Sequence, residues 1–258
     1  MWIDCQLPLT MNCIGIIPSR FGSTRFPGKP LALIGGRPMI CHVVERALAA
    51  LPRVVVATDS PRIAEAAERA GASAIMTSPD IPNGTARVLA AALMIPDCPD
   101  TIVNIQGDEP LIDPADIART VCLLEDQQVD IATIAHRFNP NRPISELTSP
   151  NRVKVVTDCM QNALYFSRHT IPYTCDLRHT LSNRIVTYLI HSGLYAYRFD
   201  TLRTLVTLTP PPAAEAERLE QLTWLHHAYK IRVAITDNDS PGVDTPDDLR
   251  LITGILDR

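Results

Sequence analysis

The sequence predicts an α/β fold built on a doubly wound, mostly parallel sheet. Its strand candidates are short, continuous apolar runs without polar alternation, which is typical of strands buried on both faces. Segments with helical spacing of apolar residues separate these runs, as in parallel sheets with crossover helices. A composition of 46% hydrophobic and 20% charged residues allows a sizeable core. We therefore expect a Rossmann-like architecture, in which ligands bind beyond the carboxyl ends of the strands.

The first half of the chain carries most of this alternation. We predict strands at residues 13–17, 53–57, 74–76 and 101–105. We predict helices at residues 39–51, 61–70 and 85–94, and from residue 114 onward. Ser60-Pro61 and Asp113-Pro114 each place a capping residue directly before a proline, and Gly71 ends the second helix.

The pattern of apolar runs in the second half of the chain predicts an inserted lobe that is rich in strands. The strand candidates are residues 130–135, 152–157, 163–166 and 194–199. We expect the lobe to cover about 137–198 and to share the sheet of the first half. An amphipathic helix at 213–229, a strand at 231–235 and a final helix capped by Thr245-x-x-Asp248 complete the chain. We divide it into an N-terminal extension, 1–11, and a single domain, 12–258.

Composition and charge exclude several classes of protein. A net charge of −4 argues against a nucleic-acid binder, which should be basic. No apolar run approaches the ~18 residues that span a bilayer, so we expect no membrane association. The first ten residues lack the basic residues of a signal peptide. The seven cysteines are dispersed, which favours reduced thiols and a cytoplasmic location.

A cationic loop follows the first predicted strand. It carries Arg20, Arg25 and Lys29 within ten residues, with flexible backbone at Gly22. It matches neither the Gly-x-Gly-x-x-Gly fingerprint nor a Walker A loop. Guanidinium forks fit phosphate oxygens, and lysine adds a point charge. The loop lies at the carboxyl end of the first strand, where this fold binds its ligand. We therefore favour a triphosphate-binding loop over a basic loop that is merely solvated.

Two aspartates complement the loop. Asp108 follows the fourth predicted strand, and Asp244 lies directly before the predicted N-cap, Thr245. Mg²⁺ prefers one or two carboxylates together with phosphate oxygens and waters, so both could hold it. Either residue could equally serve only a turn or a cap, and spacing alone does not separate these readings.

The chain resembles the cytidylyltransferases that activate acidic sugars, most closely the 3-deoxy-manno-octulosonate (KDO) cytidylyltransferase family. The resemblance is carried, in order, by IIPSRFGSTRFPGKP (16–30), VATD (56–59), NGTAR (83–87), VNIQGDEP (103–110), ALYFSRHTIP (163–172), HSGLYAYR (191–198), LEQL (219–222) and GVDTPDDL (242–249). It covers nearly the whole chain after Met11, and so implies a nucleotidyltransferase domain over 12–258.

The resemblance implies a reaction. A sugar hydroxyl attacks the α-phosphorus of CTP, and pyrophosphate leaves. It assigns Lys29, Arg20 and Asp108 to catalysis, and Asp108 and Asp244 to Mg²⁺. CTP and an acidic sugar would be the partners, and the lobe would form a homodimer interface, as in the family. A metal bridging sugar and phosphate would make a side-chain base unnecessary.

We expect binding residues at the ends of the predicted strands and at the positions that match the family's motifs. The expected nucleotide-binding residues are Ser19, Arg20, Arg25, Lys29, Thr58, Ser78, Gly84, Thr85 and Arg87. The expected sugar-binding residues, carried over from the family, are Gln106, Arg168, His191, Tyr195, Glu220 and Gln221. Arg168 is the candidate cation for the sugar carboxylate. We expect Tyr195 and Tyr197 to point to opposite faces of their strand, so that at most one faces the pocket.

Two departures from the family keep alternatives open. Ala86 stands where an acidic residue is usual, and Thr223 stands where arginine is common. The same reaction on another acidic sugar, such as an amino-KDO or a sialic-type acid, is therefore one alternative. A glycosyltransferase of similar topology is another, although Gln-Gly-Asp-Glu-Pro is no Asp-x-Asp motif. A non-catalytic paralogue should lack Lys29, Asp108 or Asp244, and all three are present.

Overall fold

The computed structural model describes residues 12–22, 26–96 and 99–256. The predicted N-terminal extension and Arg25 lie outside the described residues. The strands are β1 (Cys13–Ser19), β2 (Leu33–Ile34), β3 (Arg37–Pro38), β4 (Val54–Thr58), β5 (Ser73–Met76), β6 (Thr101–Asn104), β7 (Ile131–Arg137), β8 (Lys154–Thr157), β9 (Ala163–Ser167), β10 (Leu189–Arg198) and β11 (Ile231–Thr236). The α-helices are α1 (Met39–Ala50), α2 (Pro61–Arg69), α3 (Gly84–Ala92), α4 (Pro114–Cys122), α5 (Ile144–Thr148), α6 (Leu177–Ser182), α7 (Phe199–Leu205), α8 (Pro212–Glu217), α9 (Gln221–His226) and α10 (Pro246–Leu256). Two 3-10 turns are η1 (Lys29–Leu31) and η2 (Leu123–Glu125).

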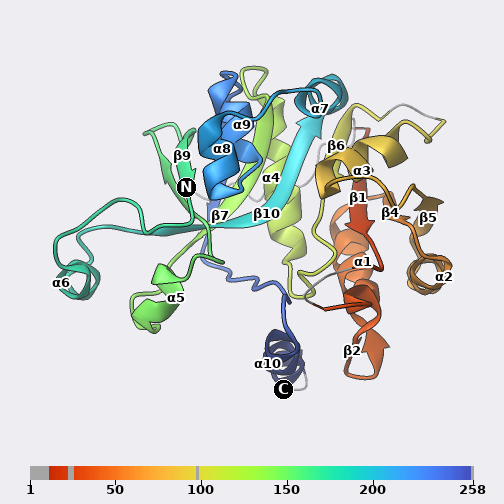
Figure 1. Ribbon diagram of the computed structural model, residues 1–258, viewed down its shortest axis with the longest axis horizontal. Coiled ribbons are helices and arrows are strands. Elements are labelled where there is room, and N and C mark those ends of the chain that lie inside the picture. The colour runs from red at the N-terminus through yellow and green to blue at the C-terminus, as the bar shows by residue number, and fades with distance from the viewer. Residues whose placement is uncertain (1–11, 23–25, 97–98, 257–258) are drawn as a thin grey trace.

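The main sheet runs in the order β11-β7-β10-β6-β1-β4-β5. Strands β6, β1, β4 and β5 run parallel to one another, and β7 runs parallel to β11. Strand β10 is antiparallel to both β6 and β7, so it is the one reversed strand in this order of a mostly parallel sheet. The predicted fold class is confirmed, and β6 and β10 form the seam between the two halves (Figure 1).

The lobe is an extension of this sheet. Strand β8 pairs with β10 and β9, and β9 pairs with β8 alone among the described strands. Helices α5 and α6 lie at the far end, opposite α1 and α2 (Figure 1). The expectation that the lobe shares the sheet is confirmed.

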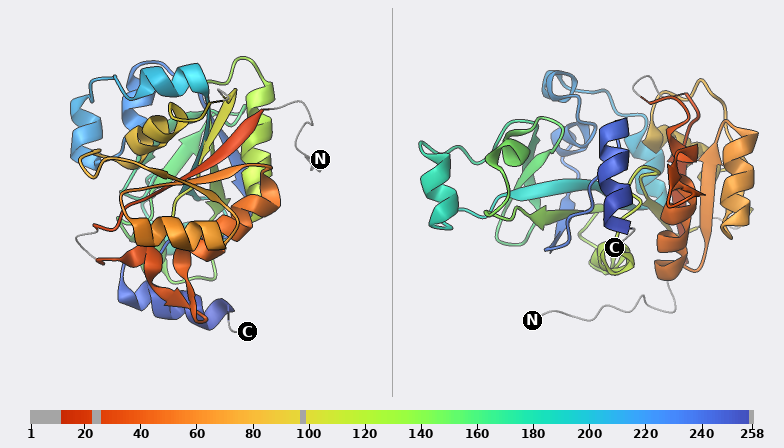
Figure 2. Two further views of the ribbon diagram at one scale, coloured as in Figure 1. Left: turned by 90° about the vertical axis from the view of Figure 1, so that its right-hand side faces the viewer. Right: turned by 90° about the horizontal axis from the view of Figure 1, so that it is seen from below.

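Helices cover both faces of the sheet because its buried side chains alternate between two cores (Figure 2). Ile17 and Val56 belong to the core under α1, α2 and α4. Ile16 and Ala57, one residue away on the same strands, belong to the core under α3, α7, α8 and α9. This is the doubly wound arrangement that the unbroken apolar runs predict.

The predicted helix at 213–229 is wrong. Two short helices, α8 and α9, replace it, and Arg218 between them adopts a left-handed conformation with φ 52°. A left-handed residue reverses the helix direction, so the apolar spacing continues across a break. The short helices α5, α6 and α7 escape prediction because 5, 6 and 7 residues display too little periodicity.

Other local predictions are borne out or corrected in part. Asp113 caps α4 by accepting a hydrogen bond from the Ala115 amide, as expected. Asp248 accepts from Thr245 N and Oγ1, which confirms the capping box of α10. In the described part of the chain Cys13 and Cys41 are free and buried, whereas Cys159 and Cys175 are free and exposed. Cys122 is disulfide-bonded, so the expectation of reduced thiols throughout is wrong.

None of the helices among the described residues combines the length and the apolarity that a bilayer crossing requires.

Candidate active site

The carboxyl ends of β1, β4 and β6 bring the predicted site residues to one edge of the sheet. A Cβ added to Gly107 would lie 3.2 Å from the Pro18 carbonyl oxygen, so glycine favours the close approach of the loop after β6 to β1. The amide of Phe21 donates to Asp59 Oδ1 at 2.9 Å, which ties the loop after β1 to the end of β4. The chain segments that follow β1, β4 and β6 therefore lie close together at this edge of the sheet.

Lys29 lies between the two predicted metal ligands. Its Nζ donates to Asp108 Oδ2 at 2.5 Å and to the Val243 carbonyl at 2.8 Å, and it lies 3.5 Å from Asp244 Oδ1. The Lys29 side chain is only 15% exposed. Two carboxylates, more than a hundred residues apart in the sequence, thus converge on one positive charge.

This convergence tests whether the residues suit a divalent cation. Asp108 and Asp244 supply two carboxylates to a point where a cation, the Lys29 ammonium, already lies within 3.5 Å of both. The described residues contain no cluster of three or more His, Cys, Asp or Glu side chains that could hold a metal by themselves. Mg²⁺ needs only one or two carboxylates when phosphate oxygens and waters complete its shell. The pair therefore fits a metal that arrives with a nucleotide.

The predicted nucleotide-binding residues lie at the ends of β1, β4, β5 and the start of α3. Gly84 packs on Pro18, because an added Cβ would lie 3.5 Å from the proline ring. Ser19 Oγ and Arg87 Nη2 are buried without a hydrogen-bond partner among the described residues. Unpaired buried donors at a strand end suit an anionic or hydrogen-bonding ligand.

Arg87 is oriented by its neighbours. Nη1 donates to Thr77 Oγ1 at 2.5 Å, and Nη2 lies 4.0 Å from Asp59 Oδ2. Burial lowers the pKa of Arg87, partly countered by Asp59. Arg20 and Ser78 are exposed, and Ser78 Oγ donates to Asp80 Oδ2. Arg25, the third predicted cation, lies outside the described residues.

A large cavity opens next to the aspartates. Its volume is about 950 Å³, and it extends from Asp108 and Asp244 along β10 into the lobe. Three predicted sugar-binding residues line it: His191, Tyr195 and Gln221. Asp108, Asp244 and these three predicted sugar-binding residues therefore border one cavity.

Gln106, Arg168 and Glu220 are not among the residues that line this cavity. The Arg168 guanidinium donates to three backbone carbonyls, those of Glu217, Pro150 and Arg218. These bonds hold the end of β9 against the break between α8 and α9. Because they occupy the Arg168 guanidinium, the assignment of Arg168 to the sugar carboxylate stays a prediction. Glu220 accepts from Thr85 Oγ1 at 2.7 Å, and burial raises its pKa.

Gln106 is fixed by β10. Its Nε2 donates to the Gly193 carbonyl at 3.1 Å, and a Cβ at Gly193 would lie 2.7 Å from Gln106 Cγ. Beside it, Glu109 accepts from Ser192 Oγ at 2.8 Å and from the Gly193 amide at 3.2 Å. Burial, with Asp108 as the second cause, raises the pKa of Glu109 to about 7. Sequence reasoning missed Glu109, although it directly follows Asp108.

The aromatic side chains of β10 correct one prediction. Tyr195 and Tyr197 lie two residues apart, so they share a face of the strand, and their rings stack at 5.8 Å. The expectation of opposite faces is wrong. Both rings pack edge-on against Trp224 of α9, and Tyr195 alone of the two lines the cavity. The packing rather than the alternation decides which tyrosine reaches the pocket.

His191 lies in the cavity wall among apolar rings. Its ring packs edge-on against Phe166 at 5.0 Å, and its Nε2 lies 3.0 Å from Thr133 Oγ1. Burial lowers the pKa of His191 to about 3. It is therefore a neutral hydrogen-bonding group at ordinary pH.

Comparison with known proteins identifies the family. The family model described as cytidylyltransferase matches residues 14–231. The chain belongs to the cytidylyltransferase family. It is an enzyme of the nucleotidyltransferase class, which excludes the glycosyltransferase alternative.

Curated relatives match this cytidylyltransferase over nearly its whole length. The 3-deoxy-manno-octulosonate cytidylyltransferase of Bacteroides thetaiotaomicron is 43% identical over 93% of this chain and 96% of its own. The 8-amino-3,8-dideoxy-manno-octulosonate cytidylyltransferase of Shewanella sediminis is 45% identical over 93% of this chain and 97% of its own. A solved structure of CMP:2-keto-3-deoxy-manno-octonic acid synthetase complexed with CTP has a TM-score of 0.85 and 39% identity, covering 95% of this chain and 98% of that one.

Proposed function

We propose that this cytidylyltransferase forms CMP-KDO from CTP and 3-deoxy-manno-octulosonate, with release of pyrophosphate. The observation that carries the proposal is the near full-length match to relatives of that name, at 41–44% identity. The convergence of Lys29, Asp108 and Asp244 supports it, because phosphoryl transfer depends on charge neutralisation and positioning.

The residues divide the work between the two substrates. Lys29 and Arg20 bind the phosphates and offset the charge that develops at the leaving pyrophosphate. The buried donors Ser19 Oγ and Arg87 Nη2 face the nucleotide. Neutral His191, Tyr195 and Gln221 offer hydrogen bonds to the sugar hydroxyls. The cavity orients the sugar hydroxyl toward the α-phosphorus. The reaction between the two bound substrates then proceeds as an effectively unimolecular step.

Magnesium belongs to the proposal as the required cofactor. Asp108 and Asp244 would hold it. When bound, Mg²⁺ supplies Lewis-acid stabilisation of phosphate charge and lowers the pKa of a coordinated hydroxyl. Lys29 would then trade its carboxylate partners for phosphate oxygens.

We further propose a cytoplasmic homodimer. A CTP-dependent reaction draws on the cytoplasmic nucleotide pool, which gives the location. Leu164 and Tyr165 on the edge strand β9 are 60% and 39% exposed, and Tyr173 in the lobe is 81% exposed. Apolar side chains on a strand edge are a typical interface between two copies. Light scattering should give about twice the chain mass, and Leu164→Asp should reduce it to one chain.

Pyrophosphate release tests the substrates directly. The protein is incubated with Mg²⁺, each of the four nucleoside triphosphates, and KDO, 8-amino-KDO or a sialic acid. We expect release with CTP and KDO, and none when either is replaced. Faster release with the amino sugar would move the assignment to the function of the Shewanella relative. No release with any pair would refute the proposal.

A further inference from the structure

The segment between β11 and α10 delivers Asp244 to the site without regular secondary structure of its own. The side chains of its first three residues, 237–239, each form a hydrogen bond or an ion pair with another part of the chain. Asp237 pairs with Arg137 at 3.0 Å. Asn238 Nδ2 donates to Asp113 Oδ2 at 2.8 Å. Asp239 is bound most extensively, by side chains of the lobe.

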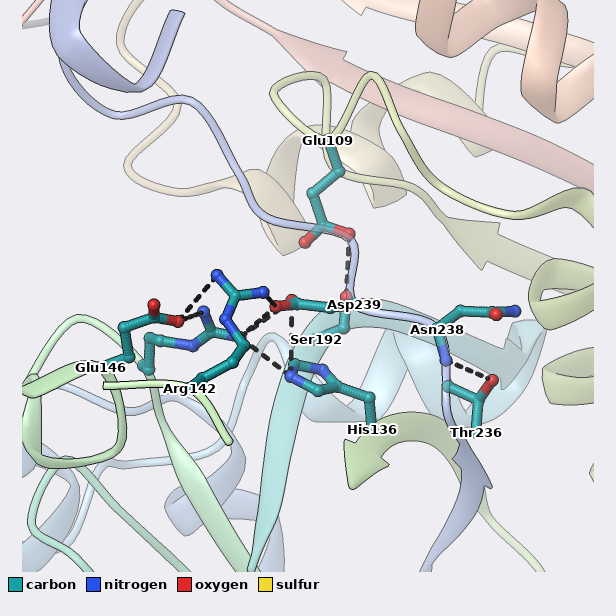
Figure 3. Close-up of polar contacts among 9 residues, drawn as sticks. Glu109, His136, Arg142, Glu146, Ser192, Thr236, Asn238 and Asp239 are labelled. Atoms are coloured by element: carbon teal, nitrogen blue, oxygen red, sulfur yellow. Dashed lines mark hydrogen bonds and ion pairs between the residues drawn. The ribbon is translucent and has the colours of Figure 1, made fainter. Parts of the chain in front are cut away.

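Asp239 is held in an ionic cluster (Figure 3), and the residues of this cluster line the cavity. Arg152 Nη2 donates to both of its carboxylate oxygens, at 2.8 and 2.9 Å, and Arg142 Nη1 donates to Oδ2 at 2.9 Å. Glu146 pairs with both arginines, at 2.8 Å to Arg142 and 3.3 Å to Arg152. His136 lies 3.4 Å from Asp239, and burial lowers its pKa. The positive charges of Arg142 and Arg152 thus offset the negative charges of Asp239 and Glu146, and the neutral His136 lies among them.

The far end of the segment carries Asp244, one of the two proposed metal ligands. Four residues after Asp239, the Val243 amide donates to the Asp108 carbonyl at 2.8 Å, and the Val243 carbonyl accepts from Lys29. Between the two ends the chain crosses Gly242, where an added Cβ would lie 3.9 Å from Glu109 Cγ. The segment is therefore anchored at one end by the ionic cluster and at the other by the β6 loop and Lys29.

We propose that Asp239, clamped by Arg142 and Arg152, is a positioning residue that sets the separation of the Asp244 and Asp108 carboxylates. The lobe thereby helps to build the metal site on the opposite half of the sheet. This inference rests on the proposed role of the two aspartates. Asp239 itself touches neither of them in the described contacts.

Asp239→Asn tests the proposal, with Asp237→Asn as the matched control. The control removes one carboxylate from the same segment, but that carboxylate is 71% exposed and has one partner. The first readout is hydrogen exchange of the metal-free protein. We expect the amides of 240–245 to exchange at least tenfold faster in Asp239→Asn, and at the wild-type rate in Asp237→Asn.

The second readout is the Mg²⁺ concentration that gives half-maximal pyrophosphate release. We expect it to rise about tenfold in Asp239→Asn, as for other groups that orient metal ligands, with kcat at saturating Mg²⁺ within about threefold of wild type. Asp239→Glu should recover part of the loss. If Asp239→Asn does not fold, Arg142→Gln at the 40% exposed arginine is read in the same way.

Unchanged exchange at 240–245, or the same response in both asparagine variants, would overturn the positioning role. A wild-type protein that releases no pyrophosphate from CTP and KDO would refute the proposed function instead. The exchange measurement needs neither substrate nor metal, so the two failures are distinguishable.

Discussion

The residue that organises the site is Lys29, because it joins the two halves of the proposed metal pair. Its ammonium contacts Asp108, Asp244 and the Val243 carbonyl, which come from the β6 loop and the segment before α10. A charged lysine that is 15% exposed is tolerated only with such partners. Removing either carboxylate would take one negative charge from this contact and one ligand from the proposed metal pair.

Asp108→Asn should therefore lower the rate of pyrophosphate release at least ~100-fold, because metal stabilisation of phosphate charge supplies several kcal/mol. Steady-state assays with CTP and KDO measure the loss. The control is Asp247→Asn, which removes an 83% exposed carboxylate from α10. Full activity in Asp108→Asn would show that the site does not use this aspartate.

The lowered pKa of His191 makes the free energy of unfolding depend on pH. Its pKa of about 3 in the folded protein lies below the ordinary value of 6.5, so the unfolded chain binds a proton first as the pH falls. The stability from neutral His191 is complete above pH 6.5 and is lost as the pH falls toward 3. Between pH 7.5 and 5.5 this loss is about 1 kcal/mol.

Urea unfolding at both pH values measures that loss. His191→Gln keeps a hydrogen-bonding side chain without titrating, so its free energy of unfolding should decline about 1 kcal/mol less than that of the wild type. An identical decline in both proteins would contradict the assignment of a neutral, buried His191.

At the scale of elements, β10 unites the nucleotide and sugar halves. It pairs with β6, β7 and β8, and its bulge between Ser192 and Tyr195 carries the contacts to Gln106 and Glu109. A bulge redirects side chains beside a site. The strand pattern predicts β10 only from residue 194, because its first half lies in the polar HSG stretch.

Gly193→Ala should destabilise the protein by about 1–3 kcal/mol, since its methyl group would lie 2.7 Å from Gln106 Cγ. The matched control is Gly254→Ala in α10, where nothing lies within 4 Å of the added Cβ. That change should stabilise by about 0.5–1 kcal/mol through helix propensity. Thermal unfolding of the two variants should shift in opposite directions, and equal shifts would be inconsistent with crowding at Gly193.

At the scale of the whole molecule, one sheet crosses from the nucleotide side to the lobe. The described main sheet has nine strands, and the lobe enters it through β8 and β10. Two cores lie on its opposite faces and each draws residues from both halves, for example Ile40 with Leu194 and Val88 with Phe166. The lobe therefore shares its sheet and both of these cores with the rest of the described chain.

Unfolding should accordingly be a single cooperative transition. Backbone circular dichroism and the fluorescence of Trp224, measured in a Trp2→Phe background, should give the same urea midpoint at one protein concentration. Trp224 reports on the junction with β10, where it packs against Tyr195 and Tyr197. Two separated midpoints would indicate that the lobe unfolds by itself.

The sequence by itself determined the fold class. Unbroken apolar runs require a sheet buried on both faces, and its strand ends are where a ligand site is then expected. Local signals such as Asp113-Pro114 and Thr245-x-x-Asp248 fixed helix starts, because capping depends on neighbours in sequence. The residues that follow β1 and β6 do come together, as the contact of Lys29 with Asp108 shows.

Only the tertiary structure decided which side chains share a contact. The break at Arg218, the shared face of Tyr195 and Tyr197 against Trp224, and the use of Arg168 by backbone carbonyls each depend on partners distant in sequence. The clamp on Asp239 joins residues that lie 87 and 97 positions apart. Periodicity reports how a residue relates to its own element, whereas charge pairing and packing are settled by the surfaces that folding brings together.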